Sequence, residues 1–192
     1  MNLKQTAVLT ALLLCLGTTT AQAAGHWRRN TARQAVKELG SNLKKALKQA
    51  MKEGGPAKAI AVCNEKALLI ADKISLERGW RVGRTSLKYR NPANAPDAWE
   101  RSVLLQFAKR RAIGENPAGM EFSEVVKKNG RLAFRYMKAI PTAPICLKCH
   151  GSHIAPAIEK EIRKLYPDDL ATGFKLNDIR GAFTITEPIS TP

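Results

Sequence analysis

One pentapeptide near the carboxyl end constrains this chain more than any other feature of its sequence. It reads Cys146-Leu147-Lys148-Cys149-His150, with two thiols three positions apart and an imidazole directly after the second. This is the pattern that attaches haem in c-type cytochromes. The thiols add across the two vinyl groups, and the imidazole becomes an axial ligand of the iron. The motif therefore predicts one haem c, bound through Cys146 and Cys149 with His150 as proximal ligand.

Two other kinds of site contain a C-x-x-C pair. A redox-active dithiol of the thioredoxin type occurs in a βαβ context, which the sequence around this motif does not suggest. A zinc site needs four ligands, and Cys63 and His153 could complete one. We favour haem, because the chain also begins with an export signal and haem c is attached in an extracytoplasmic compartment.

Residues 1–23 have the three parts of a cleaved signal peptide. Lys4 supplies the positive charge, residues 6–17 form a short apolar run, and an A-x-A cleavage site ends at Ala23. The apolar run is too short to span a bilayer, and no later segment is apolar enough to do so. We therefore expect a periplasmic protein whose mature chain, residues 24–192, is a single domain.

The chain is strongly basic, with a formal net charge of +16 at pH 7. Such a charge can indicate a nucleic-acid partner, but export and the even spread of the basic residues argue against one. Two explanations remain open. The charge can belong to a solvated surface, or it can dock an acidic redox partner or the surface of an anionic membrane.

Two amphipathic helices are expected at the start of the mature chain. Residues 27–53 place apolar side chains on one face, and residues 56–76 do so again at a spacing of three and four. The glycine pair at 54–55 separates them, as helix-ending glycines do. The pattern predicts a helical hairpin with Cys63 on the apolar face of its second helix.

The rest of the chain combines strand patterns with two further helices. Residues 121–128 and 131–140 flank Asn129-Gly130, a dipeptide that strongly favours a β-hairpin turn. The other expected elements are strands at 80–85 and 182–186, a helix at 98–112 capped by Asp97, and a short helix at 156–165. We therefore expect an α+β fold with an antiparallel sheet, unlike the all-helical small cytochromes c.

One cysteine of the mature chain has no partner. Cys15 is removed with the signal peptide, and the haem takes Cys146 and Cys149, so Cys63 is left alone in an oxidising compartment. A free cysteine is often a small buried apolar residue. Alternatively, its thiolate is the second axial ligand of the iron. The other candidates for that ligand are Met51, Met120, Met137, His26 and His153.

Five stretches of the chain together resemble one known family. They are Ala59–Asn64, Gly79–Glu100, Cys146–Gly151, Tyr166–Gly173 and Asp178–Thr184. The family is the exported c-type haem domain of unknown function that was first described structurally in a cyanobacterium. The resemblance implies a PAS-like fold, in which helices flank an antiparallel sheet and the haem lies against that sheet. It also implies that Cys63 and His150 are the two axial ligands.

Arg84 and Arg90 lie in the second of these stretches. Either could donate charge-assisted hydrogen bonds to the haem propionates. The alternative is that they form structural ion pairs with Asp97 or Glu100. Their position in the sequence leaves both roles open.

Two functions fit a haem with one thiolate and one imidazole ligand. The first is a redox sensor. Reduction adds negative charge to a low-dielectric pocket, and release of Cys63 from the iron would relieve that cost. The vacated position could then bind CO or NO. The second is an electron carrier that docks an acidic partner. A PAS-like fold is common in sensors, but fold alone is weak evidence of function. We expect no enzyme, since two axial ligands leave no site where a peroxidase would bind peroxide.

Overall fold

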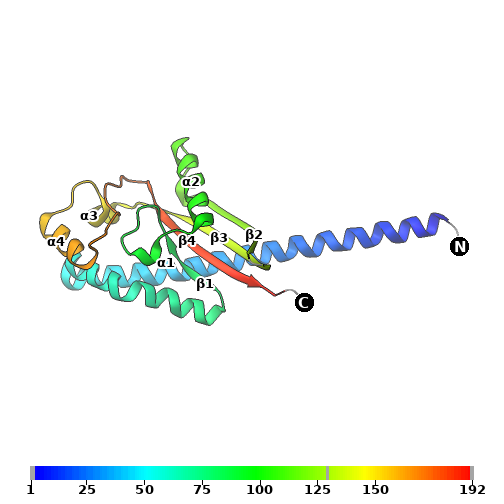
Figure 1. Ribbon diagram of the computed structural model, residues 1–192, viewed down its shortest axis with the longest axis horizontal. Coiled ribbons are helices and arrows are strands. Elements are labelled where there is room, and N and C mark those ends of the chain that lie inside the picture. Colours follow the sequence, from blue (N-terminus) through cyan, green and yellow to red (C-terminus); the bar gives the residue numbers. More distant parts are fainter. Residues whose placement is uncertain (1–2, 129, 191–192) are drawn as a thin grey trace. The chain divides into compact units, whose positions relative to one another are not determined.

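The computed structural model describes residues 3–128 and 130–190, with side chains from Gly25 onward except that of Lys128 (Figure 1). The chain divides into two compact units, Met1–Gln34 and Ala35–Pro192. The first unit is helical from Leu3 and contains the beginning of α1 (Leu3–Arg78). The second unit contains the rest of α1 and every other element, and it carries the site described below.

A break at Gly54 and Gly55 divides α1 into two arms. Gly54 has φ −159° and ψ 22°, and Gly55 has φ 66° and ψ −158°, so neither is helical. The positive φ of Gly55 is a conformation that glycine adopts at little cost. The second arm runs back along the first, and Arg78 Nη2 donates to Glu38 Oε2 over 2.6 Å. The predicted hairpin is confirmed.

The predicted start of the first helix at residue 27 is wrong, because α1 is already helical at Leu3. The residues between are rich in alanine and leucine, which favour helix strongly. The sequence also predicts that the apolar run at residues 6–17 is too short to span a bilayer and that no later segment could do so. No helix among the described residues combines the length and the hydropathy of a membrane span.

The four strands form one antiparallel sheet in the order β1-β4-β3-β2. They are β1 (Arg81–Thr85), β2 (Glu121–Lys128), β3 (Arg131–Pro141) and β4 (Ile179–Ile189). The predicted strands are confirmed, although β4 is longer than the predicted 182–186, because it pairs with β1 on one side and β3 on the other. The predicted α+β class, with helices flanking an antiparallel sheet, is confirmed.

The tight turn between β2 and β3 follows the sequence signal. Asn129 lies outside the described residues, but Gly130 has φ 79°, as a two-residue hairpin turn of this kind requires. The register continues from Lys128 opposite Arg131 along the whole of β2. This register places Met137 and Ala139 on one face of β3.

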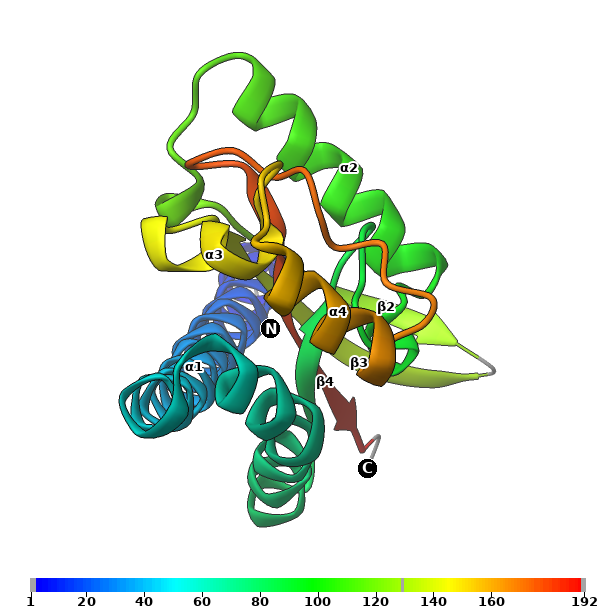
Figure 2. The ribbon, with the colours of Figure 1, turned by 90° about the vertical axis from the view of Figure 1, so that its left-hand side faces the viewer.

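Helix α2 (Ala98–Ala112) covers that face of the sheet, and Figure 2 shows the second arm of α1 on the other side. Asp97 and Glu100 form a capping box at the start of α2, which confirms the predicted cap at Asp97. The buried cluster between α2 and the sheet consists of Val103, Leu104, Phe107, Met120, Met137, Ala139 and Ala182. Both Met120 and Met137 are therefore packing residues of this core.

A buried ion-pair network fastens α2 to the strands. Glu100 Oε1 accepts hydrogen bonds from Thr184 Oγ1 at 2.8 Å and Arg135 Nη2 at 3.2 Å. Arg135 Nη1 also lies 2.8 Å from Asp97 Oδ2. Asp97 and Glu100 thus pair with Arg135. From the sequence, Arg84 and Arg90 were the candidates for this role.

Two short helices follow the sheet hairpin. The C-x-x-C-H motif forms a 3-10 turn, η3 (Pro144–Cys146), and one helical turn, α3 (Leu147–His150). The predicted helix at 156–165 is α4 (Pro156–Leu165). It packs against the second arm of α1 through a cluster built on Ile60, Ile162 and Tyr166, with Cys149, Ile154, Ile158 and Leu165 at its edge.

Candidate cofactor site

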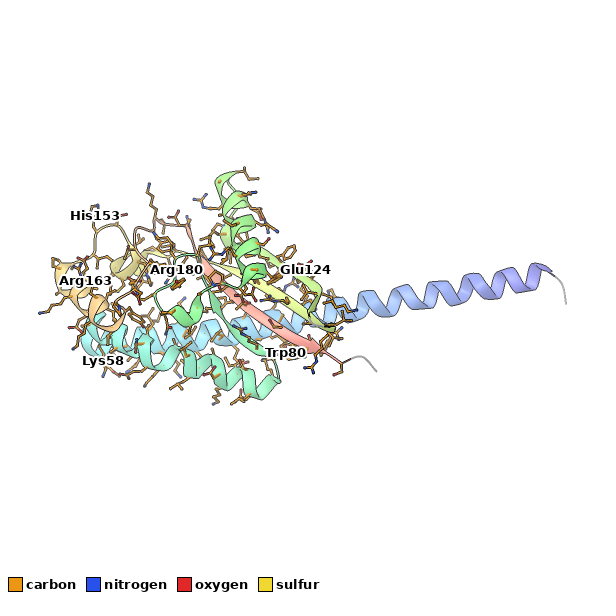
Figure 3. The ribbon with its side chains drawn as sticks, in the orientation of Figure 1. Lys58, Trp80, Glu124, His153, Arg163 and Arg180 are labelled. Carbon is orange, nitrogen blue, oxygen red and sulfur yellow. The ribbon has the colours of Figure 1, made fainter. Side chains whose placement is uncertain are left out.

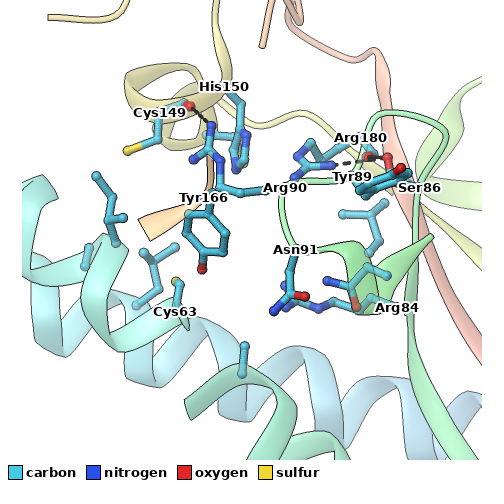
Figure 4. Close-up of a pocket in the computed structure, with 18 of the residues that line it drawn as sticks. Cys63, Arg84, Ser86, Tyr89, Arg90, Asn91, Cys149, His150, Tyr166 and Arg180 are labelled. Carbon is cyan, nitrogen blue, oxygen red and sulfur yellow. Dashed lines mark hydrogen bonds between the residues drawn. The ribbon is translucent and has the colours of Figure 1, made fainter. Parts of the chain in front are cut away.

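A cavity of about 240 Å³ lies between the hairpin of α1, the sheet and the C-x-x-C-H motif (Figure 4). The alternation of the strands decides which residues reach it, since Ile140 and Gly181 line it while their neighbours Ala139 and Ala182 pack against α2. Its apolar lining comprises Leu47, Met51, Ala59, Ile60, Ala67, Leu68, Ile140 and Ile145. Cys63, Cys146 and Cys149 line it as well.

The motif is held in a compact turn that presents its reactive side chains together. The Gly151 N–H donates to Leu147 O over 3.0 Å and closes the turn. A Cβ at Gly151 would lie 2.6 Å from the same oxygen, so the backbone approaches too closely for any other residue. Residues three apart share one face of a helical turn, which brings Cys146 and Cys149 to the same side.

His150 is held in the tautomer that a metal ligand needs. Its Nδ1 lies 2.7 Å from the carbonyl oxygen of Ala171, which can only accept, so Nδ1 carries the proton and Nε2 keeps a free lone pair. Burial lowers the pKa of His150 well below its usual value, and the positive charges of Arg180 and Arg90 lower it further. The imidazole is therefore neutral at pH 7.

Cys63 enters the cavity from the second arm of α1, on a different wall from His150 (Figure 4). Its side chain faces the open space of the cavity, and the surrounding walls shield it from part of the solvent. Burial by the surrounding protein raises the pKa of its thiol, and the charges of Arg84 and Arg90 offset this only in part. Such a thiol is protonated unless a bound metal ion displaces the proton.

The structure narrows the candidates for a second axial ligand. Met120 and Met137 belong to the core under α2, and His153 is an exposed residue beyond the motif (Figure 3). His26 belongs to the first unit. Among the candidates in the described part of the second unit, those that line the cavity are Cys63 and Met51.

The zinc alternative lacks support in the structure. Among the side chains that the structure describes, residues 25–127 and 130–190, no three of His, Cys, Asp or Glu are grouped so as to hold a metal ion by themselves. His153, which was to complete such a site, does not line the cavity. Cys63 and His150 could supply two ligand atoms from separate walls of the cavity. Two protein ligands suit a haem iron, because the porphyrin supplies the other four.

Cationic side chains reach the cavity from the sheet. Arg84 stands on β1 and Arg180 on β4, and Arg180 Nη1 donates to Ser86 Oγ at 3.3 Å and to Lys88 O at 3.2 Å. Burial and the neighbouring charges of Arg90 and Arg84 lower the pKa of Arg180 to about 10. Burial also lowers the pKa of Arg84. An anion placed among them would stabilise their charged forms.

Arg90 is engaged differently from Arg84. Its Nε and Nη2 donate to Asp169 Oδ1 and Oδ2 over 3.1 and 3.0 Å. Nη2 also lies 2.6 Å from the carbonyl oxygen of Cys149 and 3.3 Å from that of Ala171. Its structural partner is therefore Asp169, and not the Asp97 or Glu100 considered from the sequence.

Sequence reasoning missed Arg180 and Tyr166 as cavity residues. Tyr166 is 6% exposed, and its ring lies between the motif and Cys63 in Figure 4. Both fall inside stretches that carry the family resemblance, which was the only signal for them. Their side chains meet the cavity because α4 and β4 return to it from distant parts of the chain.

Comparison with known proteins agrees with this architecture. The Tll0287-like family, described as Tll0287, matches residues 18–188. This chain belongs to the Tll0287-like family. The crystal structure of the cyanobacterial heme-protein Tll0287 is similar at a TM-score of 0.63 and 26% sequence identity, over 85% of this chain and 96% of that one. No curated protein matches the chain.

Membership in the Tll0287-like family confirms the resemblance drawn from the five stretches of sequence. The α+β architecture is shared with the solved heme-protein. The PAS-like classification and the axial ligation that the resemblance implies stay predictions.

Proposed function

We propose that this protein is a mono-haem c-type protein whose haem is bound covalently through Cys146 and Cys149 and ligated by His150 and Cys63. The observation that carries the proposal is that both motif thiols, a neutral imidazole and a third thiol face one cavity. The similarity to a solved heme-protein supports the same cofactor.

The residues of the cavity fit the parts of a haem. Its apolar walls suit the flat porphyrin, and the two sheet arginines suit the propionates. Arg84 and Arg180 are the propionate partners in this proposal, because the guanidinium of Arg90 is occupied by Asp169. Charge-assisted hydrogen bonds to propionates would return the lowered pKa of Arg180 toward its ordinary value.

A redox-sensing role follows from the chemistry of Cys63. The haem iron supplies one-electron chemistry when bound. Cys63 would hold the iron as a thiolate, at a position where burial favours the neutral thiol. If an electron donor reduced the iron, the added negative charge would favour transfer of a proton from solvent to Cys63 and loss of its bond to the iron. The vacated position would admit CO or NO.

Electron transfer is the second candidate function. It is favoured by the excess of basic residues, which would dock an acidic partner or an anionic membrane surface. Lys44, Lys45, Lys48 and Lys52 line a shallow groove along the first arm of α1. Both functions place the protein in the periplasm after removal of residues 1–23, and neither makes it an enzyme.

Covalent attachment is tested by haem staining on a denaturing gel. The chain is expressed with cytochrome c maturation, alongside Cys146→Ala, Cys149→Ala and the double variant. We expect the wild type to stain and the double variant to lose the stain, because no thioether remains. Cys63→Ser is the matched control and should stain like the wild type. Equal staining of the double variant, or an unstained wild type, would refute the proposal.

The axial ligand is tested by Cys63→Ser, with Met51→Leu as the control at the other candidate that lines the cavity. Loss of thiolate should remove the charge-transfer absorption and change the spin-resonance spectrum. It should also raise the reduction potential, because an anionic donor stabilises ferric iron. Met51→Leu should change neither. If Cys63→Ser leaves the oxidised spectrum and the potential unchanged while Met51→Leu changes the spectrum and lowers the potential, Met51 is the ligand and electron transfer is the better function.

A further inference from the structure

A connected set of hydrogen bonds lies directly behind the proximal histidine. His150 Nδ1 bonds to Ala171 O, and the N–H of Ala171 donates to Asp169 Oδ1 over 2.9 Å. Asp169 in turn receives two hydrogen bonds from Arg90. The carboxylate of Asp169 therefore links the backbone N–H of Ala171 to the guanidinium of Arg90.

Arg90 contacts this set of hydrogen bonds at several points. Beyond Asp169, its Nη2 reaches the Ala171 carbonyl oxygen that His150 uses and the carbonyl oxygen of Cys149, the residue before His150. The side chains of Arg90 and Asp169 are only 11% and 7% exposed. A buried pair of this geometry is rigid, because the planar guanidinium fork matches the carboxylate.

We propose that Arg90 and Asp169 are positioning residues that fix the orientation of the His150 imidazole and its Nδ1 hydrogen bond. The inference rests on the proposed function, in which His150 ligates the iron. Groups behind a ligating histidine determine its ring orientation and its basicity. Arg90 shares the Ala171 oxygen with Nδ1, so it holds that acceptor in line with the imidazole. Arg90 thereby acts on the proximal ligand and does not bind a propionate.

Arg90→Lys separates positioning from charge. Lysine keeps a cation beside Asp169 but cannot hold both carboxylate oxygens and two carbonyls at once. We expect the haem to remain covalently bound. The Nδ1 proton of His150, found among the hyperfine-shifted signals of the ferric protein, should exchange with deuterated water about tenfold faster, equivalent to about 1.4 kcal/mol. The spin-resonance lines should broaden as the ring orientation spreads.

Asp169→Asn is the second variant. The amide presents an N–H to Arg90 in place of one carboxylate oxygen, so the bidentate pair is lost while size and shape are kept. It should show the same faster exchange and broader lines as Arg90→Lys. The matched control is the exposed ion pair on α4, in which Arg163 Nη2 lies 3.0 Å from Glu159 Oε1. Glu159→Gln and Arg163→Lys should change neither the exchange rate nor the line width.

Each outcome decides the proposal. Exchange and line width equal to wild type in both variants would overturn it, as would fast Nδ1 exchange in the wild type itself. Loss of covalent haem from both variants would also overturn it, because the pair would then be required for folding and not for ligand orientation. A wild type without haem would refute the proposed function instead, so the two failures are distinguishable.

Discussion

Gly151 follows the C-x-x-C-H motif at a point where the Leu147 carbonyl leaves no room for a Cβ. Gly151→Ala should therefore open the turn that presents Cys146 and Cys149. We expect a loss of about 1–3 kcal/mol in the free energy of unfolding, the usual cost of overpacking, together with less bound haem. Urea unfolding and haem staining measure the two effects.

Gly119→Ala is the control for this change, because nothing lies within 4 Å of the added Cβ there. It should unfold at the same urea concentration as the wild type. If the two alanine variants behave alike, the close approach at Gly151 is not what the motif depends on.

The lowered pKa of His150 makes a prediction for the haem-free chain, prepared as the double Cys146→Ala and Cys149→Ala variant. In the folded state the pKa of His150 lies well below the ordinary 6.5, because the imidazole is buried. Below pH 6.5 the unfolded state therefore binds more protons than the folded state. Stability should therefore be complete above pH 6.5 and should fall as the pH drops toward the folded pKa.

Urea unfolding at about pH 7.5 and about pH 5 measures this loss. Adding His150→Asn should reduce the loss of stability between the two pH values, because the titrating group is gone. An identical pH dependence with and without His150 would show that the imidazole is not held neutral by its surroundings.

At the scale of elements, the attachment of α2 to the sheet depends on Glu100, which is 3% exposed. Glu100→Gln removes the negative partner of buried Arg135 but leaves Asp97 beside it. We expect a loss of about 1.5–3 kcal/mol in the free energy of unfolding, the range for hydrogen bonds to charged groups. Thermal or urea unfolding measures it.

The control for that change is Glu77→Gln, on the exposed side of α1, where the carboxylate lies 3.9 Å from Lys73. Exposed pairs of this kind contribute little, so stability should change by less than about 0.5 kcal/mol. A similar loss in both variants would mean that the buried network does not hold α2 in place.

At the scale of the whole molecule, the proposed export predicts which residues the mature protein retains. The mature chain should begin at Ala24, because the A-x-A site ends at Ala23. The intact mass of protein recovered from the periplasm should lack residues 1–23 and include one haem. A mass that retains Cys15 with an added lipid would place the protein on a membrane anchor instead.

Much of the architecture could be predicted because it depends on near neighbours in the sequence. The glycine pair ends a helix through its own backbone conformation, and Asn129-Gly130 favours a turn whatever surrounds it. Period-two and period-3.6 patterns are likewise read over a few residues. The spacing within Cys146–His150 is local too, so the candidate haem site could be recognised before any fold was known.

Local sequence patterns thus predicted most of the helix bounds, the four strands and the C-x-x-C-H motif, while the contacts between distant side chains depend on the tertiary fold. Arg90 reaches Asp169 across 79 positions of the chain, and Arg180 reaches Ser86 across 94. Met120 and Met137 were ligand candidates by type, yet they pack under α2 on the far side of the sheet. Such contacts depend on sheet order and on which face each strand presents, and a register shift of one residue reverses that face.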